Sequence, residues 1–564
     1  MAGDGVSPLR ALRTLAYLRP EQIVRRLWTR AFRPWYASAF YDRYVLGAGS
    51  VAEPRRFPPA LWPGDGENGR RILEGQIRLV GQERPFPVPP DWSARDRSLL
   101  WRFNLHYFEW LGDLAAVGGD RAGQRARALI ADWIANHSRP GLPAWHPYPL
   151  SVRLYAWMRH AQFVLEGADD SFRRQFFASL DRQARHLARV VEWDVGGNHL
   201  IKNLKALVAA GHCLAGHERH ARCATAALRD ALEIQILADG GHYERSPSYH
   251  LQVLCDLVDV RTLLADADAA EAWLGETISR MAAALATFRL GDGGLVLFND
   301  GDIGDEALLE AIERRLGGLS EPPPVLAQTG YVRMQRADAI VIMDAGRCCP
   351  DDLPAHAHAD TLAFEFSSGP RRIVVNCGTF AYQDGSWRNR LRGTAAHSTV
   401  GIDEDDSAEV YGTFRLGRRP RKVVCERTDD EVGALAGGSH DGYGRYGLVH
   451  HRRLVLANDG RRLSGVDRIE RVRRDPARRL AAARFHLHPD VAVAPGDRDD
   501  KLRLSLPGQE LWSFAAPGES VRVAESVYAP RFGEMRASRQ IVVEKPLETS
   551  DTILEWEFVE SGGA

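Results

Sequence analysis

Three separated groups of polar residues could carry chemistry in this chain of 564 residues. One is His356-Ala357-His358-Ala359-Asp360, with His397 downstream. Histidines two apart on an extended backbone point to the same face, so they can share one metal ion or one sugar. Three histidines and an aspartate within about forty residues are typical of a divalent-ion site. A solvated histidine-rich loop is the plain alternative.

The second group is Gly196-Gly197-Asn198-His199, directly before an apolar-periodic segment that begins at Leu200. In the plain interpretation, Asn198 is the N-cap of a helix and satisfies a free backbone amide. In the functional interpretation, the Asn198 amide and the His199 imidazole face an anion that the helix dipole favours. The pair suits a carboxylate.

The third group is Tyr243-Glu244-Arg245-Ser246-Pro247-Ser248-Tyr249-His250, which enters a second predicted helix. Proline is tolerated in a first turn, and Ser246 is a cap candidate. In the plain interpretation, Tyr249 is a half-buried aromatic with a hydrogen-bonded hydroxyl, and Glu244-Arg245 is a surface ion pair. We expect function to be assembled from all three groups.

The elements that must position these groups change type near residue 325. Before it, Leu200, Leu204 and Leu207 recur at helical spacing, whereas Leu362 to Phe366 alternates as a strand does. Helices followed by strands favour two domains in succession and argue against alternating βαβ units. We predict a helical domain at 1–325, with an irregular N-terminal segment, and an antiparallel β-sandwich domain at 326–564, joined by a proline-rich segment.

Composition narrows the function classes. The 73 basic and 74 acidic side chains give a net charge of -1, so no global attraction to nucleic acid is expected. Seven cysteines without a CxxC pair argue against a disulfide framework and a zinc ribbon. The arginine-rich N-terminus lacks the apolar run of a secretory signal or membrane span, which predicts a cytoplasmic protein. The oligomeric state is unknown at this point.

The order of motifs resembles the heparinase II/III family of polysaccharide lyases. GGNH, YERSPSYH, HAHAD, NCGT and RGTAAHST follow one another between about residues 100 and 400. The resemblance implies an N-terminal (α/α) toroid followed by a C-terminal antiparallel β-sandwich. It also implies β-elimination at a uronic acid within an acidic polysaccharide, and no organic cofactor.

The resemblance also assigns catalytic roles. Asn198 resembles the asparagine that neutralises the uronate carboxylate, helped by His199 or His356. Tyr249 resembles the tyrosine that gives a proton to the leaving oxygen and that can take the C5 proton as phenolate. His356 resembles the alternative base, and Tyr243 is the second choice for the tyrosine.

A structural divalent metal, zinc, manganese or calcium, is a further implication. His358, Asn376 and His397 match the positions of its ligands in related lyases. The middle ligand is often aspartate in relatives, and the neutral asparagine of this chain predicts weaker binding.

For sugar binding, the sequence offers aromatic platforms and polar anchors, although the aromatics could equally pack the helices. The predicted substrate-binding residues are Trp101, Asn104, His106, Tyr107, Trp145, His146, Tyr243, Glu244, Arg388 and Arg392. Two rival functions stay open: a glycoside hydrolase that uses Glu244 with Asp300 or Asp302, and a noncatalytic polysaccharide-binding or exopolysaccharide-biosynthesis protein.

Overall fold

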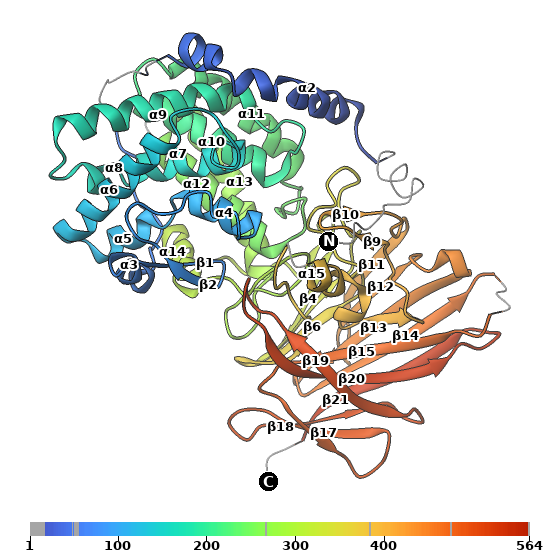
Figure 1. Cartoon of the computed structure of the whole chain (residues 1–564). Coiled ribbons are helices and arrows are strands. Elements are labelled where there is room, and N and C mark those ends of the chain that lie inside the picture. Colours follow the sequence, from blue (N-terminus) through green and yellow to red (C-terminus); the bar gives the residue numbers. More distant parts are fainter. Residues whose placement is uncertain are drawn as a thin grey trace.

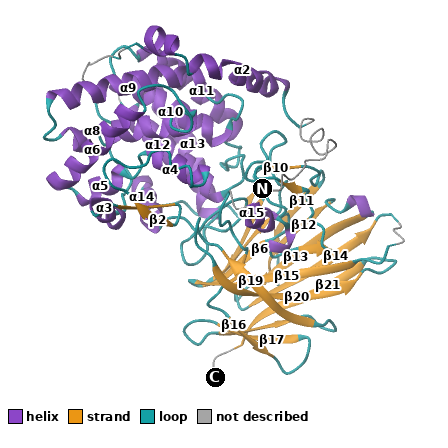
Figure 2. Cartoon of the chain, viewed as in Figure 1, coloured by secondary structure: helices purple, strands orange, loops and turns teal. Residues whose placement is uncertain are grey.

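The computed structural model describes residues 17–47, 49, 56–265, 268–382, 385–473 and 477–561. Helices fill the first part of the chain and antiparallel strands the second (Figures 1 and 2). The predicted succession of helices and strands is therefore confirmed. Within the described ranges, every helix is too short or too polar to cross a membrane.

The helical part is built mainly from long amphipathic helices. Its helices are α2 (Pro20–Tyr36), α3 (Gly66–Leu73), α4 (Leu99–Tyr107), α5 (Leu111–Val117), α6 (Gly119–Asn136), α7 (Pro147–Arg159), α8 (Ala161–Leu165), α9 (Asp170–Val190), α10 (Gly197–Cys213), α11 (Glu218–Gln235), α12 (Pro247–Leu263), α13 (Asp268–Thr287) and α14 (Glu306–Leu316). A π-helix, η1 (Tyr41–Leu46), follows α2.

Burial explains why α10 and α12 lie in the centre of this part. On α10, the predicted stripe of Leu200, Leu204 and Leu207 is at most 8% exposed. Apolar side chains on nearly all sides of α12 are buried as well. A helix that is apolar all round must be enclosed by others, so these two helices form the frame that carries the polar groups.

The N-terminal segment is more regular than predicted. It contains α2, α3 and the hairpin β1 (Gln76–Leu79) and β2 (Gln82–Pro85). Asp65 caps α3 by accepting hydrogen bonds from the Glu67 and Asn68 amides. The prediction of an irregular segment is therefore only partly right, because Pro20 and Gly66 stand at first-turn positions, which helices tolerate.

The strands form two large antiparallel sheets. One has the order β11-β12-β13-β14-β21-β18-β17-β16, and the other β19-β20-β15-β7-β6-β5-β4-β3, with β8 also paired to β15. Their bounds are β3 (Val325–Leu326), β4 (Tyr331–Arg336), β5 (Ala339–Asp344), β6 (Phe364–Ser368), β7 (Arg371–Val375), β8 (Val400–Ile402), β11 (Val423–Asp429), β12 (Gly433–His440), β13 (Leu448–Ala457), β14 (Arg462–Arg471), β15 (Leu480–Leu487), β16 (Ala492–Pro495), β17 (Lys501–Ser505), β18 (Leu511–Ala515), β19 (Val521–Tyr528), β20 (Arg536–Pro546) and β21 (Thr552–Ser561).

The two sheets enclose one apolar core. Phe364 of β6 stacks on Trp556 of β21 with ring centroids 5.5 Å apart, which joins one sheet to the other. Gly465 of β14 makes room for that indole, because a Cβ there would lie 2.1 Å from the Trp556 ring. Between the strands lie β9 (Val410–Tyr411), β10 (Arg415–Leu416), helix α15 (Gly385–Arg392) and the 3-10 turns η2 (Thr394–Ala396) and η3 (Gly444–Tyr446).

Buried polar contacts tie the helical part to the strands. The last helix of the helical part, α14, ends at Leu316, and β3, the first strand of the two large sheets, begins at Val325. Arg245, which precedes α12, bonds Asp344 at the end of β5, with 2.6 Å between Nη2 and Oδ1. Both side chains are at most 5% exposed, so the pair fixes the junction on which the polar groups converge.

Candidate active site at the junction of helices and strands

Asn198 is held at the start of α10 by a glycine turn. Gly196 and Gly197 have φ angles of 70° and 57°, a left-handed backbone that favours glycine. Gly196 takes the N-cap position, so the plain N-cap interpretation of Asn198 is wrong. Asn198 lies inside the first turn, and its side chain is buried.

The Glu244 carboxylate accepts hydrogen bonds from Asn198. The Asn198 backbone amide donates to Glu244 Oε1 at 2.7 Å, and Nδ2 donates to Oε2 at 3.1 Å. Burial acts to raise the pKa of Glu244, but His242, His356 and the Asn198 hydrogen bonds outweigh it and lower that pKa. Glu244 is therefore ionised. Its oxygens accept hydrogen bonds from Asn198, and its predicted role in substrate binding stays a prediction.

His356 lies between Glu244 and Asp300. Its Nε2 is 3.6 Å from Glu244 Oε2, and its Nδ1 is 2.9 Å from Asp300 Oδ2. Because an ionised carboxylate only accepts hydrogen bonds, Nδ1 carries a proton. Nε2 is then the nitrogen available for proton transfer.

Asp300 is the hub of the cluster. It accepts from His356, from Thr379, and from both terminal nitrogens of Arg388. Burial acts to raise its pKa, but the Arg388 guanidinium and the hydrogen bonds from His356 and His358 hold that pKa well below the usual range. Asp300 therefore fixes side chains of the strand part against the helical part.

Tyr249 completes the cluster. Its ring lies on His356 with centroids 3.9 Å apart, and its hydroxyl is 2.6 Å from that of Tyr382. Burial, then Tyr382 and the Asp300 charge, raise the pKa of Tyr249 well above its usual value. The phenol therefore keeps its proton. Asn198, Tyr249 and His356 thus lie around one place, linked through Glu244.

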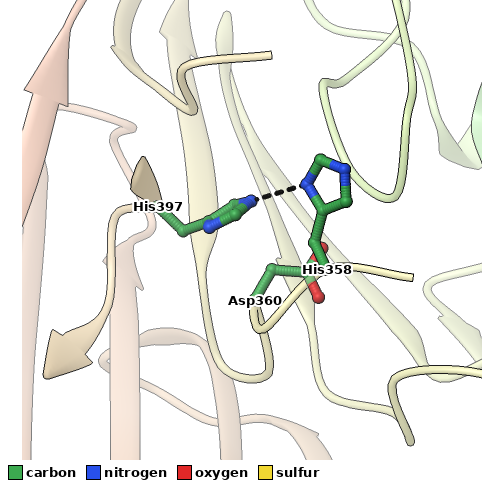
Figure 3. Close-up of side chains that lie close together, drawn as sticks. All are labelled: His358, Asp360 and His397. Atoms are coloured by element: carbon green, nitrogen blue, oxygen red, sulfur yellow. Dashed lines mark hydrogen bonds between the residues drawn. The ribbon is translucent and has the colours of Figure 1, made fainter. Parts of the chain in front are cut away.

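Beside this cluster, a second set of side chains fits a metal ion. The imidazoles of His358 and His397 face each other, with His358 Nδ1 3.0 Å from His397 Nε2, next to Asp360 (Figure 3). One ligand atom from each of the three lies within 4.8 Å of the others, and all three side chains are buried.

The protons of these histidines favour a cation. His397 Nδ1 donates to the Gly393 carbonyl at 2.8 Å, so its Nε2 has a lone pair. His358 Nε2 lies 2.9 Å from Asp300 Oδ1 and 3.2 Å from the Asp300 backbone nitrogen. The shorter contact is with an ionised carboxylate, which only accepts, so it places the proton on Nε2 and leaves a lone pair on Nδ1. Neither Asp360 oxygen accepts a hydrogen bond of normal geometry from the described residues. Two lone pairs and a carboxylate therefore converge, as metal ligands do.

Asn376 does not join these ligands. Its side-chain oxygen accepts from the Ser398 amide at 3.0 Å, and its Nδ2 donates to Glu365 Oε1 at 3.2 Å. The predicted set of His358, Asn376 and His397 therefore needs correction, with Asp360 in place of Asn376. The reason is that Asn376 directly follows β7, and its side-chain amide already bonds the Ser398 backbone and the Glu365 carboxylate.

Two further predicted residues lie near the cluster. The Tyr243 hydroxyl accepts from the Gly197 amide at 2.9 Å, so it supports the glycine turn. His199 turns to Glu192, with 3.1 Å from Nδ1 to Oε1, and stacks on Tyr148. Burial acts to lower the pKa of His199, but the Glu192 carboxylate raises it. His199 is part of a separate ion pair and does not contact Asn198 through its side chain in any described interaction.

Most predicted sugar-binding side chains are structural. Trp101, His106 and Trp145 are at most 4% exposed in the core of the helical part, where a sugar cannot reach them. The Asn104 amide donates to the Leu100 carbonyl one turn earlier, and Tyr107 packs edge-on against Tyr148. The structure contradicts these five predictions, because aromatic spacing does not distinguish a core from a cleft.

The two arginines predicted to bind substrate are also engaged within the protein. Arg388 and Arg392 are at most 1% exposed. Arg388 bonds Asp300, and Arg392 donates to backbone carbonyls that include Ala357 at 3.0 Å. They anchor the loops that carry His356 and His358, so the prediction that they bind a uronate is wrong.

A cavity of about 470 Å³ is lined in part by Glu192, the partner of His199. It lies between α2 and the start of α7, and its lining includes the predicted residues Trp145 and His146. His146 caps α7, with Nδ1 accepting from the Tyr148 amide at 3.4 Å. Of the ten predicted binding residues, His146 keeps the most plausible position for a ligand.

Sequence reasoning missed two members of the cluster. Tyr382 belongs to no quoted motif, and Asp300 was considered only as a hydrolase carboxylate. A polar Asn299-Asp300-Gly301-Asp302 run before a predicted boundary was the available signal for Asp300. Asn299 and Asp300 have a left-handed backbone, with φ 49° and 60°. Such strain is often retained where side chains must be positioned.

Two family models match the chain. "Heparinase II/III N-terminus" matches residues 90–316, and "Heparinase II/III-like, C-terminal" matches residues 319–557. Among curated proteins, FtsZ-localized protein C of Caulobacter vibrioides is 29% identical over 525 residues, covering 89% of each chain. A heparin-sulfate lyase of Bacteroides thetaiotaomicron is 23% identical over 199 residues, which cover 32% of this chain and 28% of that protein.

Solved structures share the architecture. A crystal structure of heparinase III gives a TM-score of 0.71 at 17% identity and covers 94% of this chain and 91% of that one. A heparan sulfate lyase mutant from Pedobacter heparinus gives 0.62 at 18% identity, with 93% and 88% covered. A chondroitin AC lyase of Streptomyces coelicolor with chondroitin sulphate gives 0.52 at 12% identity, with 88% and 79% covered. The predicted toroid followed by a β-sandwich is thereby confirmed.

Proposed function

This chain belongs to the heparinase II/III family, and we propose that it is a polysaccharide lyase that cleaves a uronic-acid-containing acidic polysaccharide by β-elimination. One observation carries the proposal: Asn198, Tyr249 and His356 converge at the junction, although they come from three distant segments. Binding alone does not need a phenol and an imidazole in ring contact.

In this proposal each side chain of the cluster has a role in proton transfer that the geometry supports. His356 Nε2 takes the C5 proton, because Asp300 holds the proton of Nδ1 and orients the ring. The C5–H electrons form the C4–C5 double bond, and the bond from C4 to the glycosidic oxygen breaks. Tyr249, whose raised pKa keeps it protonated, gives its proton to the leaving oxygen. The Asn198 amide stabilises the charge that develops on the uronate carboxylate.

We further propose that His358, Asp360 and His397 hold a divalent metal. The ion would neutralise Asp360 and fix the loop that carries His356, which is a structural contribution. Its chemistry as a Lewis acid is not needed for the proton transfers above.

A glycoside hydrolase is less well supported. Inverting and retaining hydrolases both need one carboxylic acid that stays protonated near neutral pH. Glu244 and Asp300 both have lowered pKa values and are tied to Asn198 and Arg388. Neither is suited to act as a general acid. Burial raises the pKa of Asp302, the third carboxyl of this alternative, but its Oδ1 accepts hydrogen bonds from the Ser248 hydroxyl at 3.1 Å and the Gly304 amide at 2.8 Å.

A noncatalytic protein is the second candidate, because one observation favours it. Ionised Glu244 already occupies the Asn198 amide, so a substrate carboxylate must displace it. FtsZ-localized protein C, whose name gives a location and no substrate, is similar along 89% of the chain.

One experiment separates the three functions. The purified protein is incubated with heparan sulfate, hyaluronan, chondroitin, alginate and bacterial exopolysaccharides, and ultraviolet absorbance and chain length are recorded. A lyase creates an unsaturated uronate that absorbs. Shortened polymer without absorbance would indicate hydrolysis, and bound but intact polymer would indicate a noncatalytic protein.

A further inference from the structure

Helix α2 exposes an unusual apolar stripe to solvent. Val24, Leu27 and Trp28 are 64%, 62% and 61% exposed, and Trp35, about two turns further on, is 41% exposed. At 3.6 residues per turn, these positions and Ala31 share one face of the helix. The aromatic surface continues into η1, where Tyr44 is 68% exposed.

The opposite face of α2 holds the helix on the protein. Gln22 is buried and its Nε2 donates to the Asp194 carbonyl at 3.3 Å. The Tyr36 hydroxyl reaches the Arg189 carbonyl at 3.5 Å, and Arg26 lies 3.8 Å from the Asp194 carboxylate. Figure 1 shows α2 at the outer edge of the helical part. The stripe therefore faces away from the body to which the helix is attached.

Positive charge surrounds the stripe. Residues 19–44 contain six arginines against one glutamate and one aspartate, although the whole chain has a net charge of -1. Arg25 and Arg30 stand on the two sides of the stripe by helical spacing. Asp42, one of the two acidic groups, is paired with Arg182. This concentration of charge favours an anionic partner.

We propose that α2 is an in-plane anchor for an anionic lipid surface, with the stripe in the interface and the flanking arginines on lipid phosphates. Tryptophan, phenylalanine and tyrosine are the side chains that favour the boundary between water and hydrocarbon. A helix of 17 residues is about 25 Å long, which is enough to lie along the surface. A second copy is a poorer occupant, because a symmetric contact would oppose the two arginine sets.

Vesicle flotation of the full chain tests the proposal. We expect the protein to float with vesicles that contain phosphatidylglycerol, more weakly with phosphatidylcholine alone, and less as salt is added. Leu27→Glu with Trp28→Glu should weaken binding at least about tenfold, because the stripe loses its apolar contact. Arg25→Glu with Arg30→Glu should also weaken it about tenfold or more, on anionic vesicles only.

The matched control is Val432→Glu with Ile553→Glu, two exposed apolar positions on the strand part, at 68% and 46% exposure. This variant should float like the wild type, and all variants should keep the wild-type melting temperature because each site is on the surface. No binding of the wild type to anionic vesicles, or equal losses in control and stripe variants, would overturn the proposal. The proposal would also be overturned if the protein does not bind vesicles and the stripe is instead required for a dimer or for a complex with an acidic protein.

Discussion

At the scale of single residues, the two tyrosines considered as proton donors, Tyr249 and Tyr243, make different contacts. Tyr249 touches His356 through its ring and Tyr382 through its hydroxyl. Tyr243 bonds only a backbone amide of the glycine turn among the hydrogen bonds of the described chain. The resemblance left Tyr243 as a second choice, and the contacts now favour Tyr249 as the proton donor.

Tyr249→Phe should therefore abolish elimination and spare polymer binding. Loss of a general acid costs about 10²–10⁴-fold in rate, whereas one hydroxyl contributes little to packing. Ultraviolet absorbance measures turnover, and affinity electrophoresis in polymer-containing gels measures binding. Tyr243→Phe is the matched control and should keep most activity. The opposite pattern would transfer the donor role to Tyr243.

The proposed metal ligands make a second prediction about single side chains. A chelator should lower the melting temperature of the wild type, and zinc or manganese should restore it, because a bound ion stabilises the folded state. Asp360→Ala and His397→Ala should melt lower and no longer respond to metal. Differential scanning calorimetry measures both effects.

Asn376→Asp distinguishes the two possible ligand sets. If Asp360 is the ligand, the new carboxylate faces Glu365 and destabilises the protein without tightening metal binding. A tighter metal response in this variant would restore Asn376 to the ligand set.

At the scale of elements, the start of α10 decides where Asn198 stands. Two consecutive left-handed glycines turn the chain so that the Asn198 amide meets Glu244. A Cβ at Gly197 would lie 2.0 Å from Glu244 Oε1, so this turn tolerates no side chain.

Gly197→Ala should cost both stability and activity. The left-handed backbone alone costs an alanine about 1 kcal/mol, and the displaced Glu244 releases Asn198 and His356. Gly216→Ala is the control, because Gly216 has φ 86° but nothing within 4 Å of an added Cβ. Urea denaturation should show a loss of stability in both variants, larger in Gly197→Ala because its Cβ also clashes with Glu244, and product absorbance should be lost only in Gly197→Ala. Equal activity would mean that the turn does not position the site.

At the scale of the whole molecule, buried histidines set the response to pH. His160, His186, His242, His250 and His486 are buried, and burial lowers their pKa values to about 3 or 4. In the unfolded chain they titrate near 6.5. Below that pH these histidines bind protons in the unfolded chain but stay neutral in the folded protein.

The free energy of unfolding should therefore be full above pH ~6.5 and fall as the pH drops toward 4, by at most about 1.4 kcal/mol per pH unit for each histidine. Buried carboxyls act in the opposite direction, with pKa values raised to about 6 for Asp113 and Asp360 and to about 7 for Asp344 and Glu365. The histidines with lowered pKa values outnumber them, since His137 and His488, at about 4, add to the five above. Denaturation at several pH values measures the slope. His160→Gln should lower this slope by up to about 1.4 kcal/mol per pH unit, which corresponds to one proton. An unchanged slope would contradict the lowered pKa of His160.

The sequence by itself determined which residue types were available and which elements carried them. Helical spacing at Leu200 and alternation at Leu362 reflect local backbone periods, so the order of helices and strands was readable from neighbours in the chain. The candidates Asn198, Tyr249 and His356 followed from the resemblance of short motifs, each of which is local to the chain.

Only the tertiary structure decided which side chains meet. Asp300, Tyr382 and Asp360 entered the site because the chain brings a loop after α13 against segments of the strand part, and no local pattern records such an encounter. Burial was equally hidden: Trp101 and Arg392 have the composition of binding residues, but the packing of distant elements closed them off from solvent. Pairing and burial depend on the whole fold, and a linear pattern contains only its own neighbourhood.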